Sequence, residues 1–326
     1  MPSSSRERAL KALLLEEPDR VPMFELEFQY PEAVVGEPYI MTGNGEGWER
    51  VVFGEKYGQM VRSGRGVDVT EHNVSVLART CSKLGYDIIR PVFVPDHLRA
   101  IRIARAIAPD LLVMGSTGGT LGVPDGGSMA EVVKRVYREF DAVASEMRLR
   151  VGQSIEGIRA QVDAGADVLV DCTDFCLKEG PFFKPSVYGE LIFPHLRMMV
   201  DAAHEKGAHF VMHTDGNLWP ILDDLIRTGI DALHSIDPSA GMRIVDVKGI
   251  YGDKIALCGN VDAAALLAYG SEGDVIREAR RCIDEGAPGG GYFLTSSNCI
   301  YRAVPVANAL ALAKTGREYG RYRHPS

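Results

Sequence analysis

Four residues that can bind a metal or transfer a proton follow short apolar runs in the second half of the chain: His213, Asp215, Cys258 and Cys299. Imidazole nitrogen, thiolate sulfur and carboxylate oxygen are donors in zinc sites, and a catalytic zinc keeps one position open. His213 and Asp215 are two residues apart on an extended segment, so both side chains can face the same side. The spacing matches no regular metal motif, and a buried cysteine is often an inert apolar residue. We hypothesise a metal site made of these four residues.

Further candidates lie near other predicted strands. Asp174 can ligate a metal, bind substrate or act as an acid or base, although aspartate in such a loop often forms a turn. Glu25 and Glu27 share one face of the alternating segment 21–28, and the alternative for this pair is that one of them meets a helix arginine. We expect Asp174 and Glu25 to be catalytic. Substrate contacts are expected from Glu27, Asn217 and Asn298.

The elements that must position these residues alternate between strand and helix patterns. Helices are predicted at 6–17, 46–84, 128–163 and 184–206, and about eight strands at 21–28, 86–93, 111–115, 166–171, 208–212, 232–236, 255–257 and 292–297. This alternation indicates βαβ units and a parallel sheet. Side chains that can bind a metal or transfer a proton recur at the ends of successive strands. This recurrence favours a barrel with its site at the C-terminal mouth. A doubly wound sheet, the alternative, would gather them at one switch point.

Composition excludes several classes of function. The formal net charge of −8 argues against nucleic-acid and anionic-membrane partners, which need a basic face. No apolar run approaches the roughly 20 residues of a membrane span, and the first residues lack a signal-peptide segment, so we expect a cytoplasmic protein. The six cysteines are scattered, which predicts reduced thiols. No linker divides the chain, and we predict a single domain spanning 1–326.

Several segments together match a known family: Pro-Asp-Arg-Val-Pro at 18–22, Gly-Pro-Phe at 180–182, Pro185 ahead of Tyr188, Ile-Phe-Pro at 192–194, His-Glu-Lys-Gly at 204–207, His-Thr-Asp-Gly-Asn at 213–217, Gly-Asn-Val-Asp at 259–262 and Tyr319 with Gly320. On these segments the chain resembles the uroporphyrinogen decarboxylase superfamily nearly end to end. It is most similar to the cobalamin-linked, corrinoid-dependent methyltransferase branch. The resemblance implies a single (β/α)8 TIM barrel with an N-terminal helical extension.

Two departures from the family pattern bear on activity. Porphyrinogen decarboxylases carry an Arg-rich segment after the first strand, where this chain has the acidic 24–30, which would repel a polycarboxylate. The zinc methyltransferases carry a His-x-Cys pair and a distant Cys. His213 matches the first ligand, and Asp215 stands where the Cys is expected. The resemblance implies that Cys299 lies near the last ligand position and that Cys258 replaces the lost thiolate.

The activity that this resemblance implies is zinc-assisted methyl transfer from a small-molecule donor to a corrinoid protein. Zinc acts as a Lewis acid on the atom that carries the methyl group. The oxygen ligand favours an oxygen-bound donor such as a methoxylated aromatic, which makes the reaction an O-demethylation. The corrinoid is expected on a partner protein, because the chain has no Asp-x-His-x-x-Gly segment. Whether the chain forms a homo-oligomer stays open.

Two other functions compete with methyl transfer. The first is a metal-free decarboxylase or lyase acting on a small carboxylated molecule, with Asp174 or Asp215 as acid or base. The second is a ligand-binding barrel without enzymatic activity. Bound zinc would distinguish methyl transfer from both alternatives.

Overall fold

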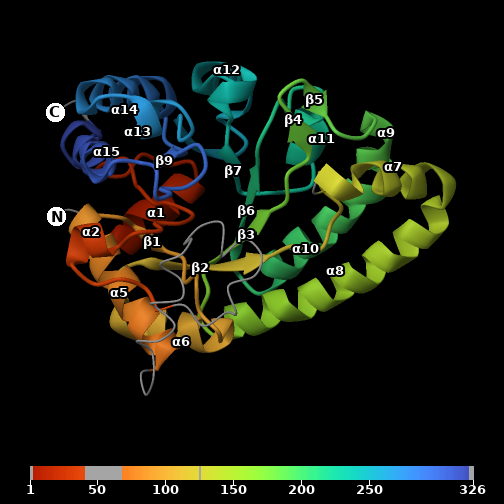
Figure 1. The fold of residues 1–326 in the computed structure, drawn as a ribbon, viewed down its shortest axis with the longest axis horizontal. Coiled ribbons are helices and arrows are strands. Elements are labelled where there is room, and N and C mark those ends of the chain that lie inside the picture. The colour runs from red at the N-terminus through yellow and green to blue at the C-terminus, as the bar shows by residue number, and fades with distance from the viewer. Residues whose placement is uncertain (1–2, 41–67, 125, 323–326) are drawn as a thin grey trace.

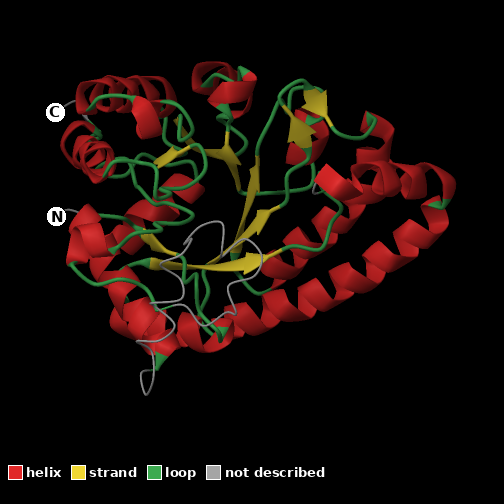
Figure 2. Ribbon diagram, viewed as in Figure 1, coloured by secondary structure: helices red, strands yellow, loops and turns green. Residues whose placement is uncertain are grey.

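Seven parallel strands form the central sheet. The computed structural model describes residues 3–40, 68–124 and 126–322. Neighbours in the sheet follow chain order: β1 (Ile88–Ile89), β2 (Leu112–Thr117), β3 (Val168–Cys172), β6 (His209–Thr214), β7 (Ala232–Ser235), β8 (Ala256–Val261) and β9 (Tyr292–Ser296). Each pair is parallel, and helices surround the curled sheet (Figures 1 and 2). The expected α/β fold with a parallel sheet is confirmed.

The predicted first strand, 21–28, contacts both edges of this sheet without forming a regular strand. Met23 makes a single parallel bridge to Leu294 of β9. On the other side the Asp87 backbone N–H donates to the Met23 carbonyl at 2.7 Å, just before β1. The segment makes isolated bridges because Pro22 has no N–H to donate to a ladder. The fully buried Asp87 carboxylate also accepts from Arg20 and from the Met23 N–H, which attaches the segment to β1.

Alternate residues of the strands face two different environments. One set lies inside the curve of the sheet, where Phe24 and Leu26 of the first segment meet small and apolar residues of the strands: Ile88, Leu112, Met114, Val168, Val170, Val211, Ala232, Ala256, Cys258 and Phe293. The intervening residues, such as Val113, Leu169 and Phe210, belong to the larger cluster under the helices. The period of two therefore assigns each strand residue to the interior or to the helical layer.

Helix α1 (Ser5–Leu13) contributes Ala9, Ala12 and Leu13 to the interior cluster, and so covers the end of the sheet where the strands begin. A capping box at Ser4 starts this helix. The predicted helix over 6–17 ends four residues beyond the observed end at Leu13. Leu15 has a φ of +63°, and the position before Pro18 disfavours the helical conformation.

The other described α-helices are, in chain order, α2 (Glu32–Val35), α5 (Val69–Leu84), α6 (His97–Ile107), α7 (Met129–Arg138), α8 (Phe140–Asp163), α9 (Pro185–Val187), α10 (Phe193–Glu205), α11 (Leu222–Ile226), α12 (Ile244–Tyr251), α13 (Leu266–Tyr269), α14 (Glu272–Gly286) and α15 (Val306–Tyr319). A short π-helix, Tyr188–Ile192, joins α9 to α10. The long helix or helix pair expected at 128–163 is the pair α7 and α8. The segment predicted as helical at 46–84 is described only from residue 68 onward, where α5 confirms its last part.

The sequence patterns gave no indication of the small antiparallel hairpin of β4 (Cys176–Leu177) and β5 (Gly180–Pro181), which follows β3. Two-residue strands are too short to show an alternating pattern. Within the described part of the chain, no helix combines the length and the apolar character that a bilayer span requires.

Candidate metal centre

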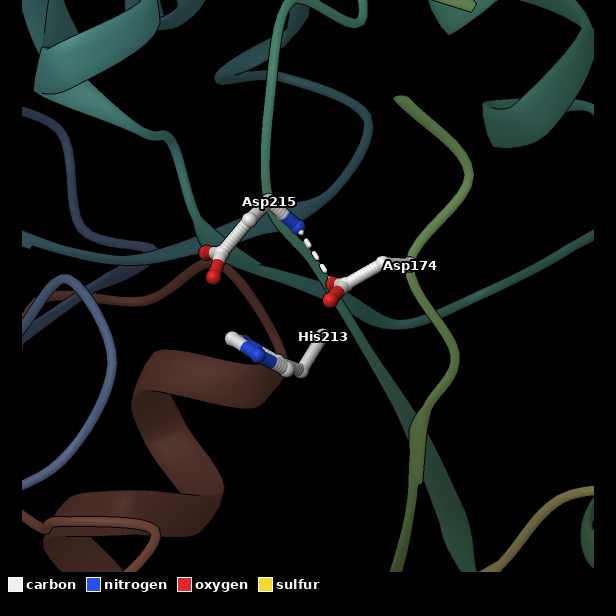
Figure 3. Close-up of side chains that lie close together, drawn as sticks. All are labelled: Asp174, His213 and Asp215. Atoms are coloured by element: carbon white, nitrogen blue, oxygen red, sulfur yellow. Dashed lines mark hydrogen bonds between the residues drawn. The ribbon is translucent and has the colours of Figure 1, made fainter. Parts of the chain in front are cut away.

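Three side chains that can ligate a metal meet where β3 and β6 end: Asp174, His213 and Asp215 (Figure 3). One ligand atom from each lies within 4.8 Å of the others. Asp174 follows β3, His213 lies on β6, and Asp215 comes directly after β6. The Asp215 backbone N–H donates to Oδ1 of Asp174 at 2.9 Å, so the two loops are joined at the site.

The sequence around β6 explains why His213 faces the interior. Val211 lies in the interior cluster and Met212 in the helical layer, so the alternation turns His213 inward. Thr214 accepts the Phe175 N–H on its side-chain oxygen at 2.9 Å, which holds the loop after β3 against β6. Gly216 has a φ of +90°, and a Cβ there would lie 2.7 Å from the Cys176 carbonyl carbon. The close approach of the two loops therefore requires glycine.

Burial and neighbouring charges set the state of Asp215. Burial raises the pKa of this carboxyl, the electrostatic effect of His213 opposes the rise, and the nearby Asp174 adds to it. Asn298 donates an amide hydrogen to Oδ2 of Asp215 at 2.8 Å. Asn298, predicted as a substrate contact, thus orients a member of the group, and its other contacts stay a prediction.

A second histidine lies behind the first. His213 and His234 are direct partners across β6 and β7, and their Nδ1 atoms are 2.8 Å apart. His234 is fully buried, and burial together with the electrostatic effect of His213 holds the pKa of its imidazole well below the usual range. With Nδ1 of His213 engaged by His234, Nε2 is the nitrogen available to a ligand.

This donor set fits a catalytic divalent metal. Zinc bonds of about 2.0–2.2 Å place neighbouring donors roughly 3–4 Å apart, so small rotations of the side chains would bring the three donors into range. A metal-bound histidine normally hydrogen-bonds through its other nitrogen, as His213 does with His234. Three protein ligands leave a position for substrate. The site has nitrogen and oxygen donors and no thiolate.

The two cysteines of the sequence hypothesis lie outside this group of three. Cys258 is in the interior cluster, where it is paired with His234 of β7 and with Phe293 of β9, and burial raises the pKa of its thiol. Cys299 is partly buried at the end of the β9 loop. Its sulfur lies 3.9 Å from the Gln29 amide nitrogen, and burial with the nearby negative charge of Glu27 raises its pKa.

The two acidic residues of the first segment have different surroundings. Glu25 is buried, and its carboxyl accepts hydrogen bonds from the backbone N–H and the hydroxyl of Ser296. Burial raises the pKa of Glu25 to about 8 despite these two bonds. Glu27 is more exposed, accepts from the Gln29 amide at 3.2 Å and lies 3.8 Å from Arg90. Glu27 is therefore the glutamate of this pair that meets an arginine. Arg90 follows strand β1, however, and does not lie on a helix as that alternative expected.

Asn217 lies in the loop after Asp215. Its side-chain oxygen accepts the Trp219 N–H at 3.2 Å, and its own N–H donates to the Leu177 carbonyl of the β4–β5 hairpin. The side chain therefore supports the loop that carries Asp215. A substrate contact by Asn217 stays a prediction.

Sequence patterns missed two polar residues of this region, His234 and Arg90. Both lie within apolar segments that the sequence pattern predicts as strands. Arg90 donates to Ser116 Oγ at 3.1 Å and to the Leu26 carbonyl, and lies 3.9 Å from the Cys172 sulfur. Cys172 is paired with His213, so Arg90 is near the candidate metal centre. The sequence feature that could have identified Arg90 is a charged residue at the end of an apolar run.

Comparison with known proteins identifies the family. The family model described as uroporphyrinogen decarboxylase (URO-D) matches residues 59–319. A uroporphyrinogen decarboxylase of Aromatoleum aromaticum is 25% identical over 241 residues, which cover 70% of this chain and 64% of that protein. The methylcobamide:CoM methyltransferase MtaA of Methanosarcina barkeri is 24% identical over 239 residues, which cover 72% and 66%. The chain thus spans just under two thirds of the length of these relatives.

A solved structure gives the same result for the fold. A methyltransferase from Methanosarcina mazei superposes with a TM-score of 0.73 at 19% identity, covering 97% of this chain and 99% of that one. This similarity extends over the described sheet and its helices. The resemblance inferred from the sequence motifs is confirmed, and the chain belongs to the uroporphyrinogen decarboxylase (URO-D) family.

Proposed function

We propose that this protein is a metal-dependent methyltransferase that passes a methyl group from a small donor to a corrinoid carried by a partner protein. The observation that carries the proposal is the group of Asp174, His213 and Asp215 at the ends of β3 and β6. The methylcobamide:CoM methyltransferase relatives support methyl exchange with a corrinoid, although their name makes the corrinoid the methyl donor, whereas here we propose it as the acceptor. The proposal places the site at the mouth of a (β/α)8 barrel, with 21–28 as its eighth strand.

We assign zinc to the three side chains, with Nε2 of His213 and one carboxylate oxygen from each aspartate as ligands. Zinc would supply Lewis-acid stabilisation of the negative charge that develops on the atom losing its methyl group. Two carboxylate ligands and no thiolate make a hard donor set. This set favours an oxygen-bound methyl group, and we propose methoxylated aromatics as the donor class, so that the reaction is an O-demethylation. The free cysteines agree with a cytoplasmic location, which is part of the proposal.

The protein groups have separate roles in this reaction. The methyl carbon is transferred to the cobalt of the reduced corrinoid, and the electron pair of the broken C–O bond stays on the oxygen. Glu25, whose pKa is about 8, is protonated at neutral pH and is our candidate for the proton donor to that oxygen. Asn298 orients Asp215, while Glu27 and Asn217 are candidate substrate contacts.

The test is methyl transfer to free reduced cobalamin, followed by its absorption spectrum, with a panel of methoxylated benzoates and phenols. We expect the zinc-loaded wild type to transfer the methyl group, and chelator-treated protein and Asp215→Ala to lose the activity by at least about 100-fold. Asp201→Ala, on the exposed side of α10, is the matched control and should retain it. Activity that is unchanged after complete removal of metal would exclude the proposed chemistry.

A second function has some support. The relatives include uroporphyrinogen decarboxylases, and Asp215, with its raised pKa, is suited to proton transfer in a metal-free lyase acting on a small carboxylated substrate. Release of carbon dioxide from such a substrate by metal-free protein would favour this function. Zinc-dependent demethylation without release of carbon dioxide would exclude it.

A further inference from the structure

His234 is the buried partner of the proposed metal ligand His213. The two ring centroids are 4.9 Å apart with the planes tilted by 53°, and the Nδ1 atoms face each other at 2.8 Å. Two neutral imidazoles at this distance share one hydrogen between their Nδ1 atoms, because one ring must donate and the other accept. Which ring donates decides whether Nε2 of His213 has a lone pair or a hydrogen.

The ring of His234 is fixed by its surroundings. It belongs to β7, lies 5.9 Å from the Phe24 ring between centroids, and is paired with Cys258 on β8. The residue is fully buried, and its Nε2 makes no hydrogen bond of normal geometry with the described residues. A neutral His234 with its hydrogen on Nε2 has a lone pair on Nδ1 and can accept a hydrogen bond there.

We propose that His234 is a positioning residue that accepts the Nδ1 hydrogen of His213 and so keeps the Nε2 lone pair of His213 directed at the metal. This inference rests on the proposed function, since it assumes that His213 binds a metal. The arrangement follows the general rule that the second nitrogen of a metal-bound histidine is hydrogen-bonded, with an imidazole in place of the usual carboxylate or carbonyl. His234 does not contact the substrate in this scheme.

The test measures zinc affinity of the full-length chain by competition with a chromophoric chelator. His234→Leu removes the acceptor, whereas His234→Asn presents an amide oxygen close to the position of Nδ1. We expect His234→Leu to bind zinc about 10- to 100-fold more weakly and His234→Asn to regain most of the affinity. His195→Leu is the control, because His195 on α10 is also buried but bonds to the Leu191 carbonyl of the preceding π-helix. That control should bind zinc like the wild type.

A second readout does not depend on the leucine variant. In 15N spectra of zinc-loaded protein with labelled histidines, His213 should carry its hydrogen on Nδ1, and the signal is assigned with His213→Gln. A His213 hydrogen on Nε2 would overturn the inference, as would wild-type zinc affinity in His234→Leu. In both cases the proposed metal chemistry stands, because the wild type still binds zinc, but a hydrogen on Nε2 would remove that nitrogen from the proposed ligand set. A wild type that binds no zinc would overturn the inference and the proposed metal chemistry together.

Discussion

The ionisation of single carboxyl groups depends on where the fold buries them. Asp215 and Glu25 are both acidic, but Asp215 has a histidine and an amide beside it, whereas Glu25 has the N–H and hydroxyl of Ser296 as its donors among the described residues. Two neutral donors are insufficient to offset the desolvation of a fully buried carboxylate, so the pKa of Glu25 rises to about 8. The folded protein therefore contains a neutral acid near neutral pH.

This raised pKa makes stability depend on pH. The pKa of Glu25 in the folded protein is above its ordinary value of 4.5. The contribution of this group to the free energy of unfolding is therefore complete below about pH 4.5, where the carboxyl is neutral, and is lost as pH rises through about 8. We expect the free energy of unfolding of the wild type to fall between pH 5 and pH 9 by on the order of a few kcal/mol more than that of Glu25→Gln. Urea denaturation at the two pH values measures the difference. The exposed Glu179→Gln serves as control, and equal pH dependence in all three proteins would contradict the assignment.

At the scale of elements, close packing of α15 holds the first segment beside β9. Gly316 lies where α15 crosses this segment, and a Cβ there would be 2.1 Å from the Met23 sulfur and 3.0 Å from Leu294. Met23 is also the residue that bridges β9 and bonds to Asp87. The packing of one helix against one sulfur atom thus supports the contact between the two edges of the sheet.

Two glycine substitutions separate this packing effect from helix propensity. Gly316→Ala should lower the free energy of unfolding by about 1–3 kcal/mol, because the added methyl group overpacks the contact with Met23. Gly157→Ala, in α8 with no atom within 4 Å of its added Cβ, should raise it by about 0.5–1 kcal/mol. Urea denaturation gives both values. If Gly316→Ala left the free energy of unfolding unchanged or raised it, α15 would be able to shift away from Met23 without cost, and the overpacking argument would be wrong.

Most elements could be predicted from the sequence because each strand is a short apolar run between helical patterns. The irregular first segment could not, since its pattern alternates well but Pro22 removes a ladder donor. The candidate site was predicted in part. His213 and Asp215 share a strand end, so their proximity follows from spacing alone, whereas Asp174 joins them through the pairing of β3 with β6. The sequence does not show which inward-facing strand residues reach the site and which lie in the apolar layer. Cys258 therefore could not be excluded as a ligand, and His234 could not be recognised as the partner of His213.

At the scale of the whole molecule, the fold separates stability from chemistry. Helix α1 covers one end of the sheet with Ala9, Ala12 and Leu13, and the interior layer above it is apolar. The candidate ligands lie at the opposite end: His213 on the last part of β6, and Asp174 and Asp215 on the loops after β3 and β6. Substitution of a ligand should therefore change metal binding with little effect on the packed interior.

The most direct test of the account is the zinc content of the purified chain after loading and desalting, measured by elemental analysis in the wild type and in four variants. We predict about one zinc per chain in the wild type, loss of most of it in Asp174→Ala and Asp215→Ala, and retention in Cys258→Ala and Cys299→Ala. Thermal unfolding of the metal-free proteins checks that each variant is folded. Retention of zinc by Asp174→Ala together with its loss from either cysteine variant would contradict the ligand set, and a wild type without zinc would contradict the proposed metal chemistry.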